Sequence, residues 1–174
     1  MDLETYLKSH IRDVPDFPAP GIVFRDITTL IGDGPALRAT VDAFRARYAG
    51  RGITRIVAPE SRGFIFGTAL GYALGLGVVL VRKPRKLPRA TRSVTYELEY
   101  GTDTLHMHED ALTAADRVVI IDDVLATGGT AEAVGKLVAD SGASVEEMAF
   151  VIELDFLSGR KRLSPLSVFS LVHY

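Results

Sequence analysis

An acidic pair followed directly by a loop of small residues is the part of this sequence best suited to chemistry. Asp122 and Asp123 stand after an apolar run at 118–121, and their carboxylates can accept hydrogen bonds from the paired hydroxyls of a sugar. The loop behind them can hold a phosphate, because its N–H groups and hydroxyls lie at the positive end of a predicted helix. The pattern predicts a ribose 5-phosphate site, with the phosphate on Ala126, Thr127, Gly128, Gly129 and Thr130.

This loop differs from the two best-known phosphate-binding motifs. No lysine follows its glycines, as a Walker A loop requires, and the G-x-G-x-x-G spacing of dinucleotide-binding folds is absent. The alternative interpretation is an ordinary strand-to-helix turn with a solvated acidic tip. That alternative accounts for two adjacent aspartates, but not for their combination with a glycine–threonine loop and a helix.

Two further segments carry groups suited to anions. Glu60, Ser61, Arg62 and Gly63 follow a short buried strand and precede a helix, and Arg62 supplies a forked donor there. The second segment, 82–92, holds six cations and two prolines. Such a run is usually a solvated loop, but beside a phosphate site it favours a lid that closes over pyrophosphate and excludes water. The candidate pyrophosphate ligands in this segment are Arg82, Lys83 and Lys86.

The elements around these segments predict an α/β fold. Short apolar runs alternate with helical patterns, which indicates a mostly parallel central sheet flanked by helices on both faces. All three candidate segments follow predicted strands, and ligands bind at the carboxyl ends of the strands in such sheets. The predicted strands lie at 56–58, 78–81, 118–121 and 145–152, with a last, edge strand at 168–172.

Other regions have simpler interpretations. Residues 2–12 carry an apolar stripe typical of a short helix, and the proline-rich stretch behind it predicts an extended path. Alternating apolar and polar residues at 94–107 indicate a hairpin. On that hairpin, His106 and His108 are expected to face solvent rather than to bind a metal. The cations at 160–162 are expected to be solvated.

Composition limits the classes of protein that this sequence can represent. The chain of 174 residues, 47% hydrophobic and 24% charged, fits one soluble domain with a sizeable core. A net charge of −2 argues against a general nucleic-acid or membrane-surface binder. The lack of cysteine excludes disulfides, thiolate metal sites and cysteine nucleophiles. No apolar run has membrane-spanning length and no secretory signal is evident, so a cytoplasmic location is expected.

The segment 118–130 resembles the signature of the type I phosphoribosyltransferases, which bind phosphoribosyl pyrophosphate (PRPP). In that family the aspartates contact the ribose hydroxyls and the loop holds the 5-phosphate, while the counterpart of residues 60–63 holds the pyrophosphate. The resemblance implies the type I phosphoribosyltransferase fold for a single domain over 1–174. A small N-terminal hood at about 1–34 and a flexible β-hairpin lid at about 82–107 are expected.

The N-terminal segment narrows the resemblance to adenine phosphoribosyltransferases. It reads Phe17-Pro18-x-Pro20-Gly21-Ile22-x-Phe24-Arg25-Asp26-Ile27-Thr28. In that family the segment forms a hood in which the residue at Phe24 stacks on adenine and backbone groups at Val23 and Arg25 read its edge. The Arg25 side chain is then expected to pair with an acid, and Leu125 to contribute to the adenine site. Thr29 stands at a position where this family is expected to have proline.

The sequence Leu98-Glu99-Tyr100-Gly101 matches the same family. It implies that Glu99 is the acid/base near a purine nitrogen and that Tyr100 closes over the site. With Arg62 these are the catalytic candidates. In the basic segment the family's cations contact pyrophosphate, in part across a dimer interface, and Arg85 stands where glycine is more typical.

The resemblance implies purine salvage, in which adenine and PRPP give AMP and pyrophosphate. It also implies Mg²⁺ held mainly by PRPP, pyrophosphate and water rather than by a dedicated cluster of side chains, and a homodimer. A transferase for 6-oxopurines is one alternative, but such a base calls for a donor such as lysine, and none follows Asp122 before Lys136. A PRPP-sensing regulator is the other, and it calls for a DNA-binding segment or a strongly basic face.

Overall fold

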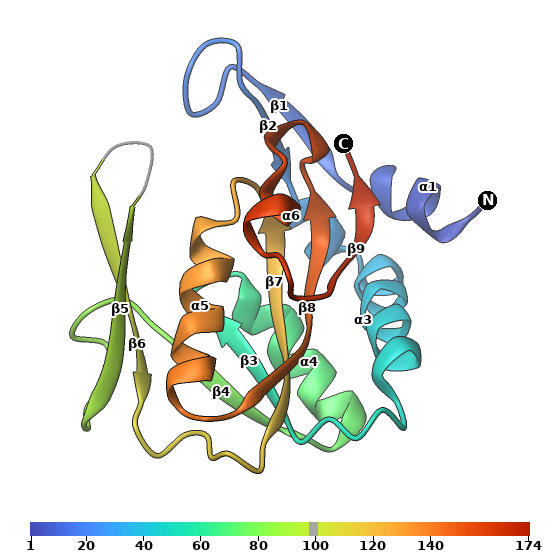
Figure 1. Cartoon of the computed structure of the whole chain (residues 1–174). Helices are drawn as coiled ribbons and strands as arrows, with labels where there is room; N and C mark the ends of the chain where they lie inside the picture. The colour runs from blue at the N-terminus through green and yellow to red at the C-terminus, as the bar shows by residue number, and fades with distance from the viewer. Residues whose placement is uncertain (98–100) are drawn as a thin grey trace.

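A five-stranded parallel sheet forms the centre of the protein (Figure 1). The computed structural model describes residues 1–97 and 101–174. The strand order is β4-β3-β7-β8-β9, and every neighbouring pair runs parallel, which confirms the predicted fold class. The strands are β3 (Arg55–Pro59), β4 (Gly77–Val81), β7 (Arg117–Leu125), β8 (Ser144–Glu153) and β9 (Val168–His173).

Helices cover both faces of this sheet. Alternate residues of a strand point in opposite directions, so the strands present apolar side chains on both faces and both faces need a helical cover. Val119 and Ile121 of β7 pack into a core shared with α1, α3 and α4, whereas Val118 and Ile120 pack into a second core shared with α5. Among the described residues, none of the helices combines the length and hydropathy that crossing a bilayer requires. The helices are α1 (Leu3–Lys8), α2 (Thr28–Gly32), α3 (Gly34–Tyr48), α4 (Gly63–Leu74), α5 (Gly129–Asp140) and α6 (Gly159–Arg162), with a 3₁₀ turn at Asp155–Leu157.

Two antiparallel hairpins flank the sheet. The first pairs β1 (Arg12–Pro15) with β2 (Val23–Asp26), and the second pairs β5 (Thr91–Glu97) with β6 (Thr102–His108). The second confirms the hairpin predicted at 94–107. In Figure 1 both hairpins reach toward the end of the molecule at which β7 terminates.

The N-terminal helix is shorter than predicted. Asp2 caps it by accepting a 2.9 Å hydrogen bond from the backbone N–H of Thr5, but the helix ends at Lys8 rather than near residue 12. Arg12 begins β1 instead and pairs with Asp26 of β2. Local periodicity could not reveal this boundary, because the strand is defined by a partner that lies far along the sequence.

The two histidines of β6 are half-buried, so the prediction that they face solvent is wrong. His106 Nδ1 lies 3.0 Å from Thr91 Oγ1 on the paired strand. His108 lines a small surface cavity with Leu87 and Ala111, and its Nε2 is buried without a hydrogen-bond partner among the described residues. Packing of the hairpin against the edge of β4 covers this face.

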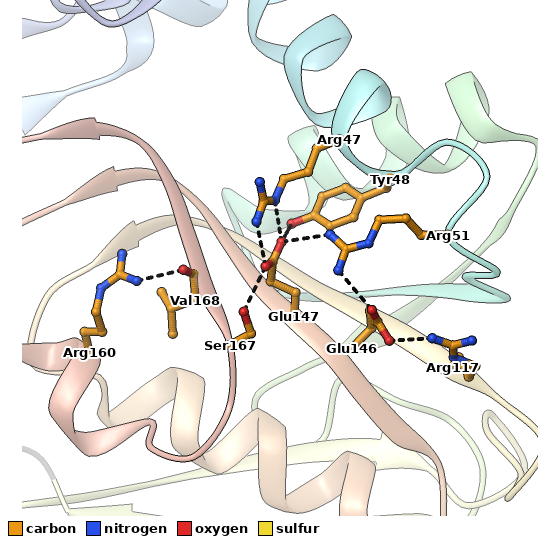
Figure 2. A network of polar contacts seen from close by, with 9 residues as sticks. All are labelled: Arg47, Tyr48, Arg51, Arg117, Glu146, Glu147, Arg160, Ser167 and Val168. Carbon is orange, nitrogen blue, oxygen red and sulfur yellow. Dashed lines mark hydrogen bonds and ion pairs between the residues drawn. The ribbon is translucent and has the colours of Figure 1, made fainter.

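A network of polar contacts fastens α3 to β8 (Figure 2). Glu147 of β8 is only 1% exposed, and both its carboxylate oxygens are occupied. Arg47 donates to them over 2.5 and 2.8 Å, Tyr48 donates over 2.8 Å, and Ser167 over 3.0 Å. Burial alone raises the pKa of Glu147, but these bonds outweigh burial and lower the pKa to about 2. The carboxylate is therefore a charged structural group.

Candidate active site

The predicted anion-binding segments meet at one cavity, at the carboxyl ends of β3 and β7. Its volume is about 410 Å³. Parallel strands end at the same edge of the sheet, so the loops that follow them converge there. Of the predicted site residues, the lining includes Glu60, Ser61, Arg62, Lys83, Asp122, Asp123, Leu125, Ala126, Thr127, Gly128, Gly129 and Thr130.

The loop between β7 and α5 presents a helix N-terminus to the cavity. Gly128 has a φ of 86°, a left-handed conformation that glycine adopts without steric cost, and α5 begins at the next residue. The N–H groups of the first turn are therefore directed at the cavity beside the hydroxyls of Thr127 and Thr130, a suitable arrangement for a phosphate. Strand β7 runs as far as Leu125, so both aspartates lie within the strand rather than beyond it.

The two members of the acidic pair differ in burial and in their partners, since Asp122 is half-buried and Asp123 is buried. Asp122 Oδ1 accepts a 2.8 Å hydrogen bond from the backbone N–H of Asp123, while the Asp123 side chain, in a residue 6% exposed, accepts from Arg62. Burial and the neighbouring Asp123 carboxylate raise the pKa of Asp122 well above its usual range. Arg62 therefore joins the loop after β3 to the acidic end of β7.

The start of α4 lies directly against this acidic pair. A Cβ added to Gly63 would lie 2.9 Å from Asp122 Oδ1 and 3.1 Å from the carbonyl oxygen of Ile121. Only glycine allows the loop after β3 to approach β7 this closely. This packing requirement is separate from the anion-binding role predicted for the same residue.

A chain of side chains connects the basic segment to the phosphate loop. Lys83 donates to Asp103 of β6, and this bond raises the pKa of Lys83. Tyr96 of β5 donates to the same carboxylate over 3.4 Å, and its hydroxyl lies 3.3 Å from Thr130 Oγ1. Sequence reasoning missed Tyr96 and Asp103, which are partners in the hairpin register. The signal available was an acidic residue opposite a buried tyrosine on the paired strand.

The other basic residues of this segment lie further from the cavity. Arg82 donates to Glu60 over 2.7 Å and to the Lys86 carbonyl over 3.3 Å, and Lys86 is exposed. Arg85, which replaces the glycine typical of the family, has a φ of 65°. It thus adopts the left-handed conformation for which glycine is best suited. Neither Arg82 nor Lys86 belongs to the lining of the cavity.

The residues predicted to bind adenine are not all brought together. Leu125 lines the cavity, whereas Val23, Phe24 and Arg25 lie on β2 of the first hairpin and do not belong to the lining. Phe24 is half-buried, with its ring centroid 5.2 Å from that of Phe17.

The Arg25 side chain is occupied within the hairpin region. It forms an ion pair with Asp13 and lies 3.9 Å from the ring centroid of Tyr174, so it contacts an acid as expected. Glu99 and Tyr100, the predicted acid/base and the residue that closes over the site, lie outside the described residues.

Two of the arginines predicted to be solvated make specific contacts instead. Arg160 donates to both carboxylate oxygens of Glu153, over 2.9 and 2.6 Å, and Arg162 donates to Glu132 over 2.6 Å. Their spacing in the sequence gave no sign of this, because both partners lie in other elements.

Three potential metal ligands also gather at the end of β8. One atom each of Glu153, Asp155 and His173 lies within 4.8 Å of the others. Glu153 already accepts hydrogen bonds from Arg160 and, over 2.6 Å, from Ser170, so its carboxylate is satisfied within the protein.

Comparison with known proteins agrees with the geometry. The phosphoribosyl transferase domain matches residues 32–171. Adenine phosphoribosyltransferases of Acidobacterium capsulatum and Geobacter metallireducens are each 55% identical over 97% of this chain, and over 93% and 98% of their own lengths. The crystal structure of adenine phosphoribosyltransferase from Thermoanaerobacter pseudethanolicus has a TM-score of 0.95 at 48% identity and covers 99% of this chain and 100% of its own.

A second structure shows a relative with ligands. The Saccharomyces cerevisiae enzyme, in complex with adenine and an imino-altritol bisphosphate, has a TM-score of 0.93 at 41% identity over 97% of this chain and 98% of its own. Both the domain match and the identities extend over most of the sequence. The chain belongs to the adenine phosphoribosyltransferase family.

Proposed function

We infer that the chain transfers the 5-phosphoribosyl group of PRPP to adenine, giving AMP and pyrophosphate, as in purine salvage. The observation that carries this inference is the cavity in which an acidic pair, a helix-terminal phosphate loop and two cations, Arg62 and Lys83, face one another. PRPP carries a ribose diol between a 5-phosphate and a pyrophosphate, and the three parts of the cavity match these three groups. The names of the relatives agree with this reaction.

We assign each part of PRPP to one part of the cavity. The loop 126–130 takes the 5-phosphate, with N–H donors at the start of α5. Asp122 and Asp123 accept from the ribose hydroxyls. Residues 60–63 and Lys83 take the pyrophosphate, and Arg82 and Lys86 approach it when the basic segment closes.

The reaction needs no side-chain nucleophile, because the purine nitrogen itself attacks the anomeric carbon as the bond to pyrophosphate breaks. Positive charge develops on the ribose in the transition state, and the nearby carboxylates of Asp122 and Asp123 stabilise it. Arg62 and Lys83 stabilise the negative charge that accumulates on the departing pyrophosphate. We propose that Glu99 acts as the acid/base for the proton on a purine nitrogen, and that Tyr100 closes over the site and excludes water.

Mg²⁺ fits this donor set. Glu60, Asp122 and Asp123 bring carboxylate oxygens to the cavity, and Mg²⁺ prefers oxygen ligands while keeping several waters. The ion would be held mainly by the oxygens of PRPP and pyrophosphate and by water. These carboxylates would accept hydrogen bonds from the water ligands of the ion. When bound, Mg²⁺ would neutralise part of the negative charge of the pyrophosphate.

Adenine is the base that the site favours. Val124 and Leu125 give the end of β7 an apolar surface, and no lysine stands there to donate to a 6-oxo group. The hood, with Phe24, Val23 and the Arg25 backbone, closes over the base. A base panel tests this: with PRPP and Mg²⁺, adenine is expected to give AMP, and hypoxanthine, guanine and xanthine to give no nucleotide. IMP, GMP or XMP would contradict the base assignment, and PRPP binding without any product would favour a regulator.

We also propose a homodimer. Tyr72 is 91% exposed and lies two helical turns from the exposed Ile65 on the same face of α4, and Leu80 on the neighbouring edge strand β4 is 40% exposed. An exposed apolar surface of this kind is typical of an interface between subunits. Sedimentation equilibrium is expected to give twice the mass of one chain, and Tyr72→Asp to shift it toward that of a monomer. A wild-type monomer would refute the proposal.

The remaining expectations concern organisation and location. A single domain over 1–174, with a hood at about 1–34 and a lid at about 82–107, is supported by the two hairpins at the end of the sheet where the cavity lies. PRPP and AMP carry several charges and do not cross a bilayer unaided, so a cytoplasmic location would give the enzyme access to them. Cell fractionation tests the location.

A further inference from the structure

The short helix α6 lies against the outer side of the phosphate loop, beside the carboxyl end of β7 (Figure 1). Gly159, its first residue, contacts that loop so closely that a Cβ there would lie 2.1 Å from the carbonyl oxygen of Ala126 and 3.0 Å from the backbone nitrogen of Gly128. Its φ does not lie in the left-handed region, so the backbone conformation alone would tolerate alanine. The requirement for glycine therefore comes from the contact with the loop.

Arg160 fixes α6 to the sheet. Its guanidinium donates to both oxygens of Glu153 at the end of β8, a residue only 4% exposed, and over 2.7 Å to the carbonyl of Val168 in β9. A bidentate pair of this kind fixes orientation as well as distance. The helix is thus fastened to two strands of the sheet, β8 and the edge strand β9.

Arg162 fixes the other end of α6 to the helix that follows the loop. It donates over 2.6 Å to Glu132, in the first turn of α5. Its Cβ would lie 3.4 Å from a Cβ at Gly128, and its Nη1 would lie 3.4 Å from one at Gly129. Arg162 does not line the main cavity, so it lies behind the loop rather than in front of it.

We propose that α6 is a positioning element for the 5-phosphate loop of this enzyme, with Gly159 and Arg162 as positioning residues. The inference rests on the proposed assignment of the 5-phosphate to loop 126–130. The N–H groups of a short loop bind an anion strongly only when their directions are fixed before the ligand arrives. Glycines at 128 and 129 leave this loop few constraints of its own, and α6 supplies them.

Gly159→Ala tests the proposal, with Gly77→Ala on β4 as its matched control, because a Cβ at Gly77 would meet only the flexible side chain of Arg55, at 3.3 Å. The displaced loop is expected to raise the KM for PRPP and the Kd for AMP by about tenfold or more, while the Kd for pyrophosphate and the KM for adenine change less than about twofold. Gly77→Ala is expected to change none of them. Equal weakening of all four ligands, or an unchanged Kd for AMP, would overturn the proposal.

Arg162→Ala keeps the proposal testable if Gly159→Ala does not fold. Its control is Arg117→Ala, which removes an exposed arginine that donates over the same 2.6 Å to Glu146, away from the cavity. Arg162→Ala is expected to weaken AMP binding by about threefold or more with pyrophosphate binding unchanged, and Arg117→Ala to alter neither. Similar results for the two variants would count against a positioning role.

Thr127→Val, a change within the loop itself, separates this proposal from the ligand assignment beneath it. If Thr127→Val weakens AMP binding and Gly159→Ala does not, the assignment stands and the role of α6 is refuted. If neither variant weakens AMP binding, the 5-phosphate does not bind at the loop, and the proposal fails with that assignment. Weakening by both, with pyrophosphate binding intact, supports the proposal.

Discussion

At the centre of the candidate site, the folded protein disfavours the charged form of Asp122. This residue is half-buried at the cavity and its neighbour Asp123 is also acidic, so both burial and repulsion disfavour its charge. An ordinary structural residue would avoid this arrangement. A carboxylate that must accept hydrogen bonds from a sugar and face a developing cation has a reason to retain it.

We predict opposite effects of Asp122→Asn on function and on stability. Because the folded-state pKa is raised, the native protein holds a proton that the unfolded chain releases above about pH 3.8, so stability falls as the pH rises from there through the folded pKa. The amide removes this cost and keeps the 2.8 Å bond from the Asp123 N–H. The melting temperature at pH 8 is expected to rise, while the KM for PRPP rises about tenfold or more.

Asp116→Asn is the matched control for that variant. Hydrogen bonds from Thr113 and Thr54 lower the pKa of Asp116, so its charged form is favoured in the native state and the amide is expected to lower the melting temperature. PRPP binding should be unaffected. A lower melting temperature for both variants would show that Asp122 is not electrostatically unfavourable.

Lys83 and Lys86 are three residues apart but differ in position. Lys83 lines the cavity and is held by Asp103, whereas Lys86 is exposed and lies outside the lining. We therefore predict that Lys83→Ala raises the Kd for pyrophosphate about tenfold and Lys86→Ala changes it less than about threefold, as measured by calorimetry. A larger effect of Lys86→Ala would mean that the basic segment rearranges when the ligand binds.

At the scale of elements, local pattern predicted the central β-strands and their helices but not the first hairpin. β7 and β8 are long apolar runs buried on both faces, so their composition alone identifies them. β1 and β2 have four residues each, and they are strands only because they pair with each other across a proline-rich loop. Such pairing leaves no periodic pattern in the sequence.

The first hairpin contacts Tyr174, the residue after β9, through Arg25, and Lys8 of α1 lies over the same ring. The ring lies 3.9 Å from the Arg25 guanidinium carbon and 5.2 Å from Lys8 Nζ. Because Arg25 follows the predicted stacking residue Phe24, we predict that Tyr174→Ala raises the KM for adenine by about three- to tenfold, with the KM for PRPP unchanged. Tyr174→Phe keeps the ring and should behave as wild type. Equal changes in both KM values would argue against a role in the hood.

At the scale of the whole molecule, the sequence predicted which segments come together at the candidate site better than it predicted the side-chain hydrogen bonds that join them. Loops after parallel strands must converge, so residues 60–63, 122–123 and 126–130 could be brought together without a structure. The bonds of Tyr96 and Asp103 to Lys83 and of Arg162 to Glu132 could not, because each joins elements that approach one another only in the folded chain.

Stability of the whole fold depends on the Glu147 network (Figure 2). The lowering of its pKa from about 4.5 to about 2 corresponds to roughly 3 kcal/mol of unfolding free energy. This contribution is fully present above pH 4.5 and is lost as the pH falls toward 2, because protonation of Glu147 leaves Arg47 without its partner.

Glu147→Gln is therefore expected to lower the unfolding free energy at pH 7 by about 3 kcal/mol and to flatten its decline between pH 5 and 3, as measured by urea titration at each pH. Glu146→Gln is the matched control, since the neighbouring carboxylate also binds arginines but is more exposed, at 25% of its side chain against 2%. Surface pairs contribute little, so this variant should unfold much as wild type does. If both variants lost the same stability, the number of arginine contacts rather than the burial of Glu147 would determine the acid sensitivity of the fold.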